Sequence, residues 1–211
     1  MFKDQSPLVK LIWAALAFFA AYALISGRWE LAFVAIVTGL LSLVPIALAR
    51  WVQIEMPRIF IVISTAFIGG TLFLGEAFDF YNRFWWWDIL LHGGSAMVFG
   101  LTGFVLVFMM FQGNRFAAPH IAIAFFAFCF AMTIGAMWEV FEFSMDQTIG
   151  TNMQKSGLVD TMTDLIVDAI GAFIGASSGY GYLKGRDYGG LGGLIEDFVA
   201  RNPQLFRNWR K

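Results

Sequence analysis

Side chains that could bind a metal recur at spacings of three and four residues between positions 88 and 168 of this 211-residue chain. Residues three or four apart share one face of an α-helix, so each group would present its polar atoms together. The groups are Asp88 and His92, Glu139 and Glu142, and Asp160, Asp164 and Asp168. Hard carboxylate ligands with one imidazole suit Mg²⁺, Mn²⁺, Ca²⁺ or iron better than a structural zinc site.

The rest of the sequence is unusually apolar. Hydrophobic residues make up 59% of the chain and charged residues 14%, against roughly 25% in an average soluble domain. The mean hydropathy is +0.69. A soluble domain of this size could not bury so much apolar surface, which excludes a soluble globular enzyme and predicts an integral membrane protein.

Two further classes are excluded by charge and cysteine content. The net charge of −1 leaves no basic excess for binding a nucleic-acid backbone, so we expect no nucleic-acid partner. The single cysteine, Cys129, cannot form an intramolecular disulfide or a multi-cysteine metal site.

Helices must therefore position the candidate ligands within a membrane. A transmembrane helix needs about 20 mostly apolar residues. The sequence predicts an all-α, polytopic fold with one six-helix transmembrane domain over residues 1–183, whose site-bearing half is about 87–179. The predicted spans are Leu8–Ser26, Leu31–Leu48, Ile59–Ala77, Asp88–Gln112, His120–Asp146 and Thr161–Leu183.

Basic residues predict the orientation of these spans, because cytoplasmic loops are enriched in Lys and Arg. Of the fourteen Lys and Arg residues, eleven lie in the termini or in the second and fourth loops. Arg28, Arg83 and Lys155 lie on the other side. We therefore expect both termini to be cytoplasmic and the first, third and fifth loops, with the acidic helix ends, to lie on the outer side.

The C-terminal segment 184–211 is predicted to be a basic, amphipathic cytoplasmic tail. It mixes Leu194, Ile195, Phe198 and Val199 with basic residues. This composition is typical of a helix that lies on an anionic membrane surface. Binding to a partner protein is the alternative.

The depth of the acidic residues within the predicted spans indicates that some of them lie inside the membrane. At 1.5 Å per residue, Asp168 would lie about 12 Å below Asp160, and Glu139 about 10 Å below Asp146. Ionisable residues inside a membrane usually face the bundle interior or a water-filled cavity and mark functional sites. The outer side has few basic residues, so bound protons or a bound cation must neutralise the cluster. For Asp88 and Asp160, a role as hydrated helix N-terminal residues stays open.

Glycines continue the acidic face of the last predicted span. Gly171, Gly175 and Gly179 form a GxxxGxxxG pattern on the same side as the three aspartates. Such a pattern lets a neighbouring helix approach closely. We expect it to hold the acidic half of this helix against the bundle interior.

Three motifs in order resemble the YjdF family of bacterial inner-membrane proteins. They are Asp88-Ile-Leu-Leu-His92, Trp138-Glu139-Val-Phe-Glu142, and Asp160-Thr-Met-Thr-Asp164 with Gly171 beyond it. The resemblance covers about Trp87 to Gly179 and implies a site made from Asp88, His92, Glu139, Glu142, Asp160 and Asp164. YjdF-like proteins have no established activity, so the resemblance implies no reaction.

A looser likeness connects the chain with VanZ-like membrane proteins. It consists of the D-x3-H opening one helix and of Asp164, Asp168, Gly171 and Gly175 opening the last. VanZ-like proteins are associated with resistance to teicoplanin. This sequence has Asp168 where they usually have Asn, so resistance is not carried over.

Three functions are consistent with these features. The leading hypothesis is a membrane-embedded, periplasm-facing site that binds a divalent cation and acts on a lipid or lipid-linked envelope substrate. Asp88 and His92 would be a ligand pair or a general base. The metal ligands would be Glu139, Glu142, Asp160, Asp164 and Asp168.

The alternatives are a non-catalytic accessory or structural subunit of a membrane complex and, less favoured, a transporter. Expected partners are membrane lipids and either another membrane protein or a second copy of the chain. No phosphate-binding loop of the G-x-x-x-x-G-K-[ST] type is present in the sequence. The type of reaction therefore stays open.

Overall fold

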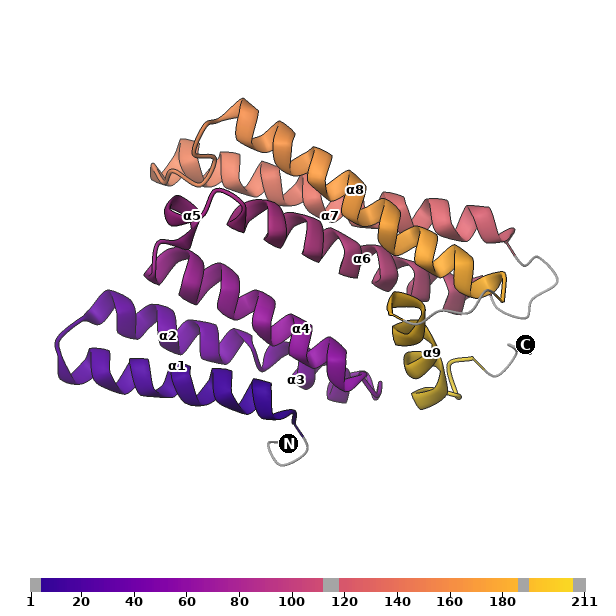
Figure 1. Ribbon diagram of the computed structural model, residues 1–211, viewed down its shortest axis with the longest axis horizontal. Helices are drawn as coiled ribbons and strands as arrows, with labels where there is room; N and C mark the ends of the chain where they lie inside the picture. The colour runs from indigo at the N-terminus through magenta and orange to yellow at the C-terminus, as the bar shows by residue number, and fades with distance from the viewer. Residues whose placement is uncertain (1–4, 112–117, 186–189, 207–211) are drawn as a thin grey trace. The chain divides into compact units, whose positions relative to one another are not determined.

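The computed structural model describes residues 5–111, 118–185 and 190–206 (Figure 1). These residues form helices, turns and loops, with no strand among them. Five helical segments are long and apolar enough to cross a membrane. They are Pro7–Ile25, Trp29–Trp51, Arg58–Ala77, Trp87–Phe111 and His120–Ile149. The all-α, multi-pass membrane fold predicted from the sequence is thereby confirmed.

The predicted sixth span corresponds to helix α8, Leu158–Leu183. Its 26 residues are enough to cross a bilayer. It is not among the five apolar segments, because Asp160, Asp164 and Asp168 lower its hydropathy. Six membrane crossings therefore stay a prediction.

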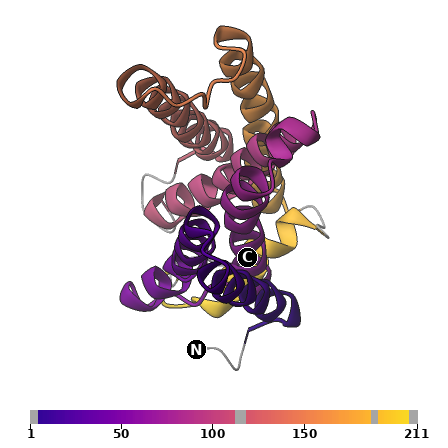
Figure 2. The same ribbon diagram turned by 90° about the vertical axis from the view of Figure 1, so that its left-hand side faces the viewer.

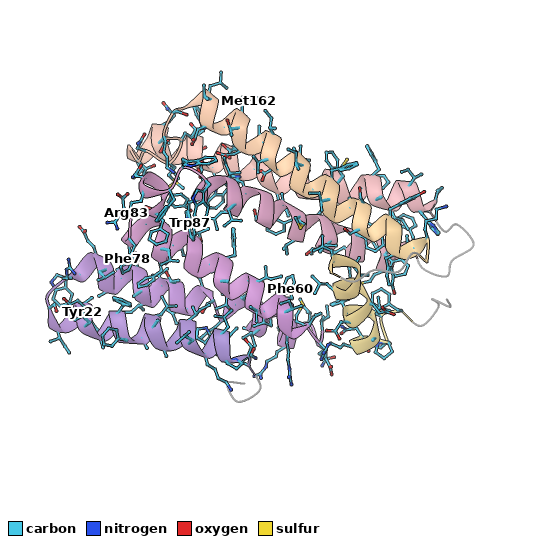
Figure 3. The ribbon with its side chains drawn as sticks, in the orientation of Figure 1. Tyr22, Phe60, Phe78, Arg83, Trp87 and Met162 are labelled. Carbon is cyan, nitrogen blue, oxygen red and sulfur yellow. The ribbon has the colours of Figure 1, made fainter. Side chains whose placement is uncertain are left out.

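The chain divides into two compact units, and unit 1 consists of Met1–Trp87 with Ala200–Asn202. It contains α1, α2, α3, α4, the π-helix η1 and α5, which end at Arg83. Their bounds are Pro7–Ile25, Trp29–Leu41, Val44–Trp51, Arg58–Ile68, Gly69–Ala77 and Phe80–Arg83. Phe78, labelled in Figure 3, packs against Phe19 and Phe73 with ring centroids 5.5 and 5.2 Å apart.

The predicted spans of unit 1 are interrupted where the sequence suggested continuous helices. The segment predicted as Leu31–Leu48 breaks between α2 and α3, where Pro45 stands in the first turn of α3 and has no N–H to donate. The Ser42 hydroxyl at the break accepts a 2.9 Å hydrogen bond from Trp13 Nε1. The segment predicted as Ile59–Ala77 changes from α-helix to π-helix at Gly69, the first of two glycines.

Unit 2 consists of Asp88–Val199 with Pro203–Lys211 and contains the candidate ligands. Its three long helices, α6, α7 and α8, run lengthwise along one another in Figure 1, and Figure 2 shows that α7 and α8 diverge toward the loop that joins them. Their bounds are Trp87–Phe111, His120–Ile149 and Leu158–Leu183. The buried core of the unit is apolar and includes Phe104, Phe108, Ile123, Ala127, Ala176 and Tyr182.

The glycines of α8 lie where α6 approaches most closely. A Cβ at Gly175 would overlap the Met97 carbonyl oxygen and lie 3.1 Å from the Cα of Gly100. A Cβ at Gly100 would lie 2.9 Å from the Ala172 carbonyl oxygen. The prediction that this pattern permits close helix packing is confirmed.

The C-terminal segment differs from the predicted surface helix. Its described part contains α9, Leu191–Arg201, and Ile195 is 1% exposed in the core of unit 2. Leu194, Phe198 and Val199 pack against that same core. These apolar residues therefore pack against the protein, whereas the sequence predicted that they face a membrane surface. Arg186, Arg207, Arg210 and Lys211 lie outside the described residues.

Candidate metal-binding site

Three helices of unit 2 each contribute one side chain to a buried group of possible ligands. His92 comes from α6, Glu139 from α7 and Asp164 from α8, and one ligand atom of each lies within 4.8 Å of the other two. Glu139 is 4% exposed and Asp164 is 3% exposed. The helical spacing of these residues could not by itself bring them together, since each lies on a different helix.

A second group shares one of these ligands. Asp88, Asp160 and Asp164 also place one carboxylate oxygen each within 4.8 Å of the others. The side chain of Asp88 is 25% exposed, and Asp160 is half-buried. We refer to His92, Glu139 and Asp164 as the inner group, and to Asp88, Asp160 and Asp164 as the outer group.

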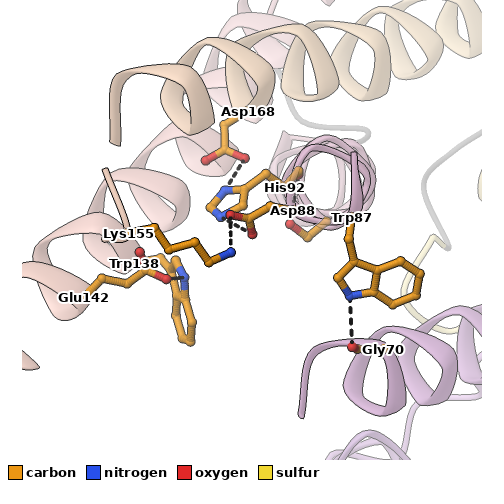
Figure 4. A network of polar contacts seen from close by, with 9 residues as sticks. Gly70, Trp87, Asp88, His92, Trp138, Glu142, Lys155 and Asp168 are labelled. Carbon is orange, nitrogen blue, oxygen red and sulfur yellow. Dashed lines mark hydrogen bonds and ion pairs between the residues drawn. The ribbon is translucent and has the colours of Figure 1, made fainter. Parts of the chain in front are cut away.

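His92 lies between two carboxylates, as Figure 4 shows. Its Nδ1 is 3.4 Å from Asp168 Oδ1, and its Nε2 is 3.9 Å from Asp88 Oδ1. Metal-binding histidines characteristically direct their second ring nitrogen at a carboxylate, which fixes the orientation of the ring. Asp168 is placed to orient His92 in this way.

Space for the Asp168 carboxylate depends on a glycine in α7. A Cβ at Gly135 would overlap Asp168 Oδ2. That oxygen is buried and has no hydrogen-bond partner among the described residues. Gly135 thus permits α8 to bring Asp168 against α7.

Glu139 is buried, and neither of its carboxylate oxygens accepts a hydrogen bond of good geometry from a described residue. The nearby Thr161 hydroxyl could donate to this carboxylate, but it does not meet that geometry. A buried carboxylate that lacks a partner costs free energy, which a proton or a cation would offset. The α7 segment carries no basic residue near Glu139 that could fill this role.

Glu142 has a different partner from the one expected. Its Oε1 accepts a 2.8 Å hydrogen bond from Trp138 Nε1, one helical turn earlier on α7 (Figure 4). Glu142 belongs to neither group of possible ligands. Trp138 belongs to the motif Trp138-Glu139-Val-Phe-Glu142, but the sequence analysis did not predict its hydrogen bond with Glu142.

The loop between α7 and α8 supplies a lysine to the cluster. Lys155 Nζ lies 3.6 Å from Asp88 Oδ2. Asp146 holds the loop by accepting hydrogen bonds from Thr151 Oγ1 at 2.7 Å and from the backbone N–H groups of Met153 and Gln154. The sequence identified Lys155 as an outer basic residue without assigning it to Asp88, because nothing in its spacing indicates how the loop folds back.

Taken together, the structure brings five of the seven predicted site residues into the two groups, and Asp168 into contact with one of them. The grouped residues are Asp88, His92, Glu139, Asp160 and Asp164. A set of four carboxylates and one imidazole could hold a hard or borderline divalent cation, which would act as a Lewis acid.

Comparison of the sequence with known proteins identifies the family of the chain. An uncharacterised protein of Thermotoga maritima is 30% identical over 117 residues, which are 54% of this chain and 57% of that protein. No solved structure matches the sequence. The family model described as predicted membrane protein (DUF2238) matches residues 8–185, which include every candidate ligand. The chain belongs to the DUF2238 family of membrane proteins.

Proposed function

We propose that this protein binds a divalent cation in its membrane-embedded site and acts there on a lipid or lipid-linked envelope substrate. One observation carries the proposal: His92, Glu139 and Asp164, from three helices, bring ligand atoms within 4.8 Å of one another while both Glu139 oxygens have no hydrogen-bond partner among the described residues. The family match agrees with the resemblance to YjdF-like proteins.

Repulsion between the carboxylates of the site supports a bound cation, because without one their negative charges are not compensated. Two carboxylates about 5 Å apart repel by roughly 3 kcal/mol at an effective dielectric constant of 20. Asp164 has carboxylate neighbours in both groups. A divalent cation replaces this repulsion with attraction and supplies the ligation that Glu139 lacks.

The surroundings of the site support a substrate that resides in the bilayer. The α8 face opposite the aspartates is apolar and exposed at Met162, Ile166, Ile170 and Phe173 (Met162 in Figure 3). This surface suits lipid chains. Asp88 and Asp160 are partly exposed, so a polar headgroup could reach the outer group. The Lys and Arg distribution supports a periplasmic opening in the inner membrane.

The test is the metal content of detergent-purified protein, measured by inductively coupled plasma mass spectrometry. We expect stoichiometric Mg, Mn, Ca or Fe in the native chain and its loss in Glu139→Gln. The matched control is Glu76→Gln, which removes an exposed acid of unit 1 and should leave the metal content unchanged. A native protein that is folded and free of metal would overturn the proposal.

A structural role for the same residues is the second candidate. It is favoured by the contacts of His92 with Asp168 and of Lys155 with Asp88, which give these side chains partners without any substrate. A structural site should lose thermal stability or assembly when Asp164→Asn is introduced. A site that acts on lipid should lose turnover of lipid phosphates in a variant that stays folded.

Transport is disfavoured by the residues beneath the site. In the described part of unit 2, the buried residues below the cluster are apolar or small, and the Phe104 and Phe108 rings stack there with centroids 5.8 Å apart. A transport path would need ionisable or polar groups across the whole membrane. A cation flux into vesicles that contain the purified protein would contradict this reasoning.

A further inference from the structure

We propose that the site holds two divalent cations which share Asp164, and that Lys155 competes with the outer one. This inference rests on the proposed cation site and adds its stoichiometry, its bridging ligand and its competitor. The inner cation would bind His92, Glu139 and Asp164. The outer cation would bind Asp88, Asp160 and the same Asp164.

The shared residue is the first support. Asp164 supplies a ligand atom to both groups, and in each group the atoms lie within 4.8 Å of one another. A carboxylate has two oxygens and can therefore ligate two cations at once. In two-metal sites the cations are about 3.5–4 Å apart, a separation that one bridging carboxylate permits.

Unpartnered buried oxygens are the second and independent support. Both oxygens of Glu139 and Oδ2 of Asp168 are buried and accept no hydrogen bond from a described residue. Glu139 is 4% exposed and Asp168 is 2% exposed. Buried polar groups are nearly always satisfied in native proteins, so the two unsatisfied oxygens of Glu139 indicate a missing positive ligand at the inner group, which Asp164 joins to the outer group.

The number of carboxylates is large enough to neutralise two divalent cations. Six carboxylates surround the site, and the one lysine found near them in the described structure is Lys155. If all six were ionised and His92 were neutral, the carboxylates and Lys155 together would keep three net negative charges with one divalent cation bound and one net negative charge with two. The six are Asp88, Glu139, Glu142, Asp160, Asp164 and Asp168.

Lys155 is placed to compete with the outer cation. Its Nζ lies 3.6 Å from Asp88 Oδ2 and so neutralises part of the outer group. A cation that binds Asp88 must repel or displace this ammonium. Hydrogen bonds from the loop backbone to Asp146 hold the loop that carries Lys155 at the end of α7. The position of this loop therefore affects the affinity of the outer group for a cation.

Manganese is the probe that separates one cation from two. Detergent-purified full-length protein is titrated with Mn²⁺, and bound ions are counted while electron paramagnetic resonance reports exchange coupling between them. We expect two Mn²⁺ per chain with a coupled spectrum in the native protein. Asp160→Asn should bind one Mn²⁺ with an uncoupled spectrum, and Glu76→Gln should behave as the native chain.

Lys155→Gln tests the competition between Lys155 and the outer cation through a gain, rather than a loss, of affinity for Mn²⁺. Removing the ammonium should tighten the second Mn²⁺ several-fold and leave the first unchanged. This variant removes a partly buried charge in a loop and keeps every candidate ligand, so a folding defect, which would weaken binding, cannot mimic the expected gain.

The outcomes distinguish this inference from the proposed function. One Mn²⁺ per chain in both the native protein and Asp160→Asn would overturn the outer site while leaving the proposed cation site intact. Two ions without exchange coupling would overturn the shared Asp164. Absence of Mn²⁺ binding in the folded native protein would overturn the proposed function itself.

Discussion

At the scale of single residues, the site depends on what surrounds the candidate ligands. His92 lies 3.4 Å from Asp168, and Asp168 occupies space that exists because residue 135 is glycine. Asp168 belongs to neither ligand group, so we assign it a positioning role toward His92. The sequence counted Asp168 among the metal ligands, and its place beside the imidazole supports this different role.

Replacing Gly135 by alanine should disturb the site without removing a ligand. The new Cβ would overlap the Asp168 carboxylate, and overpacking of this kind costs about 1–3 kcal/mol. Loss of a partner that orients a metal-binding histidine typically weakens metal affinity about 10–100-fold. Mn²⁺ titration of Gly135→Ala measures this effect.

The matched control for that substitution is Gly94→Ala, because a Cβ at Gly94 has nothing within 4 Å. It should keep native affinity for Mn²⁺. Equal affinities in Gly135→Ala and Gly94→Ala would show that Asp168 does not position His92.

At the scale of helices, α8 has two chemically different faces. Asp164, Asp168, Gly171 and Gly175 lie on its buried side, while large apolar residues such as Ile166 are exposed. The small residues allow the backbones of α6 and α8 to approach each other. This close approach is what brings Asp164 near the ligands on α6.

Gly175→Ala should therefore separate α6 from α8. Its Cβ would overlap the Met97 carbonyl oxygen, which belongs to rigid backbone and cannot move aside like a side chain. We expect a loss of about 1–3 kcal/mol of stability, visible as a lower thermal unfolding temperature in detergent.

Gly39→Ala serves as the control for this helix-packing prediction. A Cβ at Gly39, in α2, meets open space, so the substitution should be neutral or slightly stabilising through its higher helix propensity. An unchanged unfolding temperature in Gly175→Ala would mean that α6 and α8 are not packed as described.

The loop between α7 and α8 should loosen when its anchor is removed. Asp146 accepts three hydrogen bonds from loop residues, and α7 ends nearby at Gly150 in a left-handed conformation. In Asp146→Ala we expect trypsin to cleave after Lys155 several-fold faster than in the native protein. Cleavage at the native rate would show that these hydrogen bonds do not hold the loop.

At the scale of the whole molecule, the chain is an all-α membrane protein of the DUF2238 family. Five helical segments qualify as spans by length and hydropathy, and α8 would be the sixth. With six spans both termini lie on one side of the membrane, as the distribution of Lys and Arg predicts. The acidic ends of α7 and α8 would then face the periplasm.

Cysteine labelling tests this orientation. In a Cys129→Ser background, Asn152→Cys places a thiol in the loop after α7, and Arg50→Cys places one near the end of α3. We expect a membrane-impermeant maleimide to label Asn152→Cys in intact spheroplasts and Arg50→Cys after permeabilisation alone. Labelling of Arg50→Cys in intact spheroplasts would contradict the predicted topology.

The membrane class, the helices and the composition of the candidate site follow from the sequence by itself. Hydropathy over about 20 residues and periodicity of 3.6 residues are local properties, so they identify apolar spans and place Asp160, Asp164 and Asp168 on one face. The same local reasoning treated interrupted helices as continuous, because it took no account of Pro45 or of the glycines that begin η1.

Only the tertiary structure decided which side chains meet. Contacts between helices depend on the rotation and depth of each helix, and these are set by packing over the whole unit. Packing through Gly100, Gly135 and Gly175 brings the ligands of α6, α7 and α8 together. The folding of a loop brings Lys155 to Asp88. Spacing along the chain predicts neither the meeting of these ligands nor the contact between Lys155 and Asp88, because both join residues on separate elements.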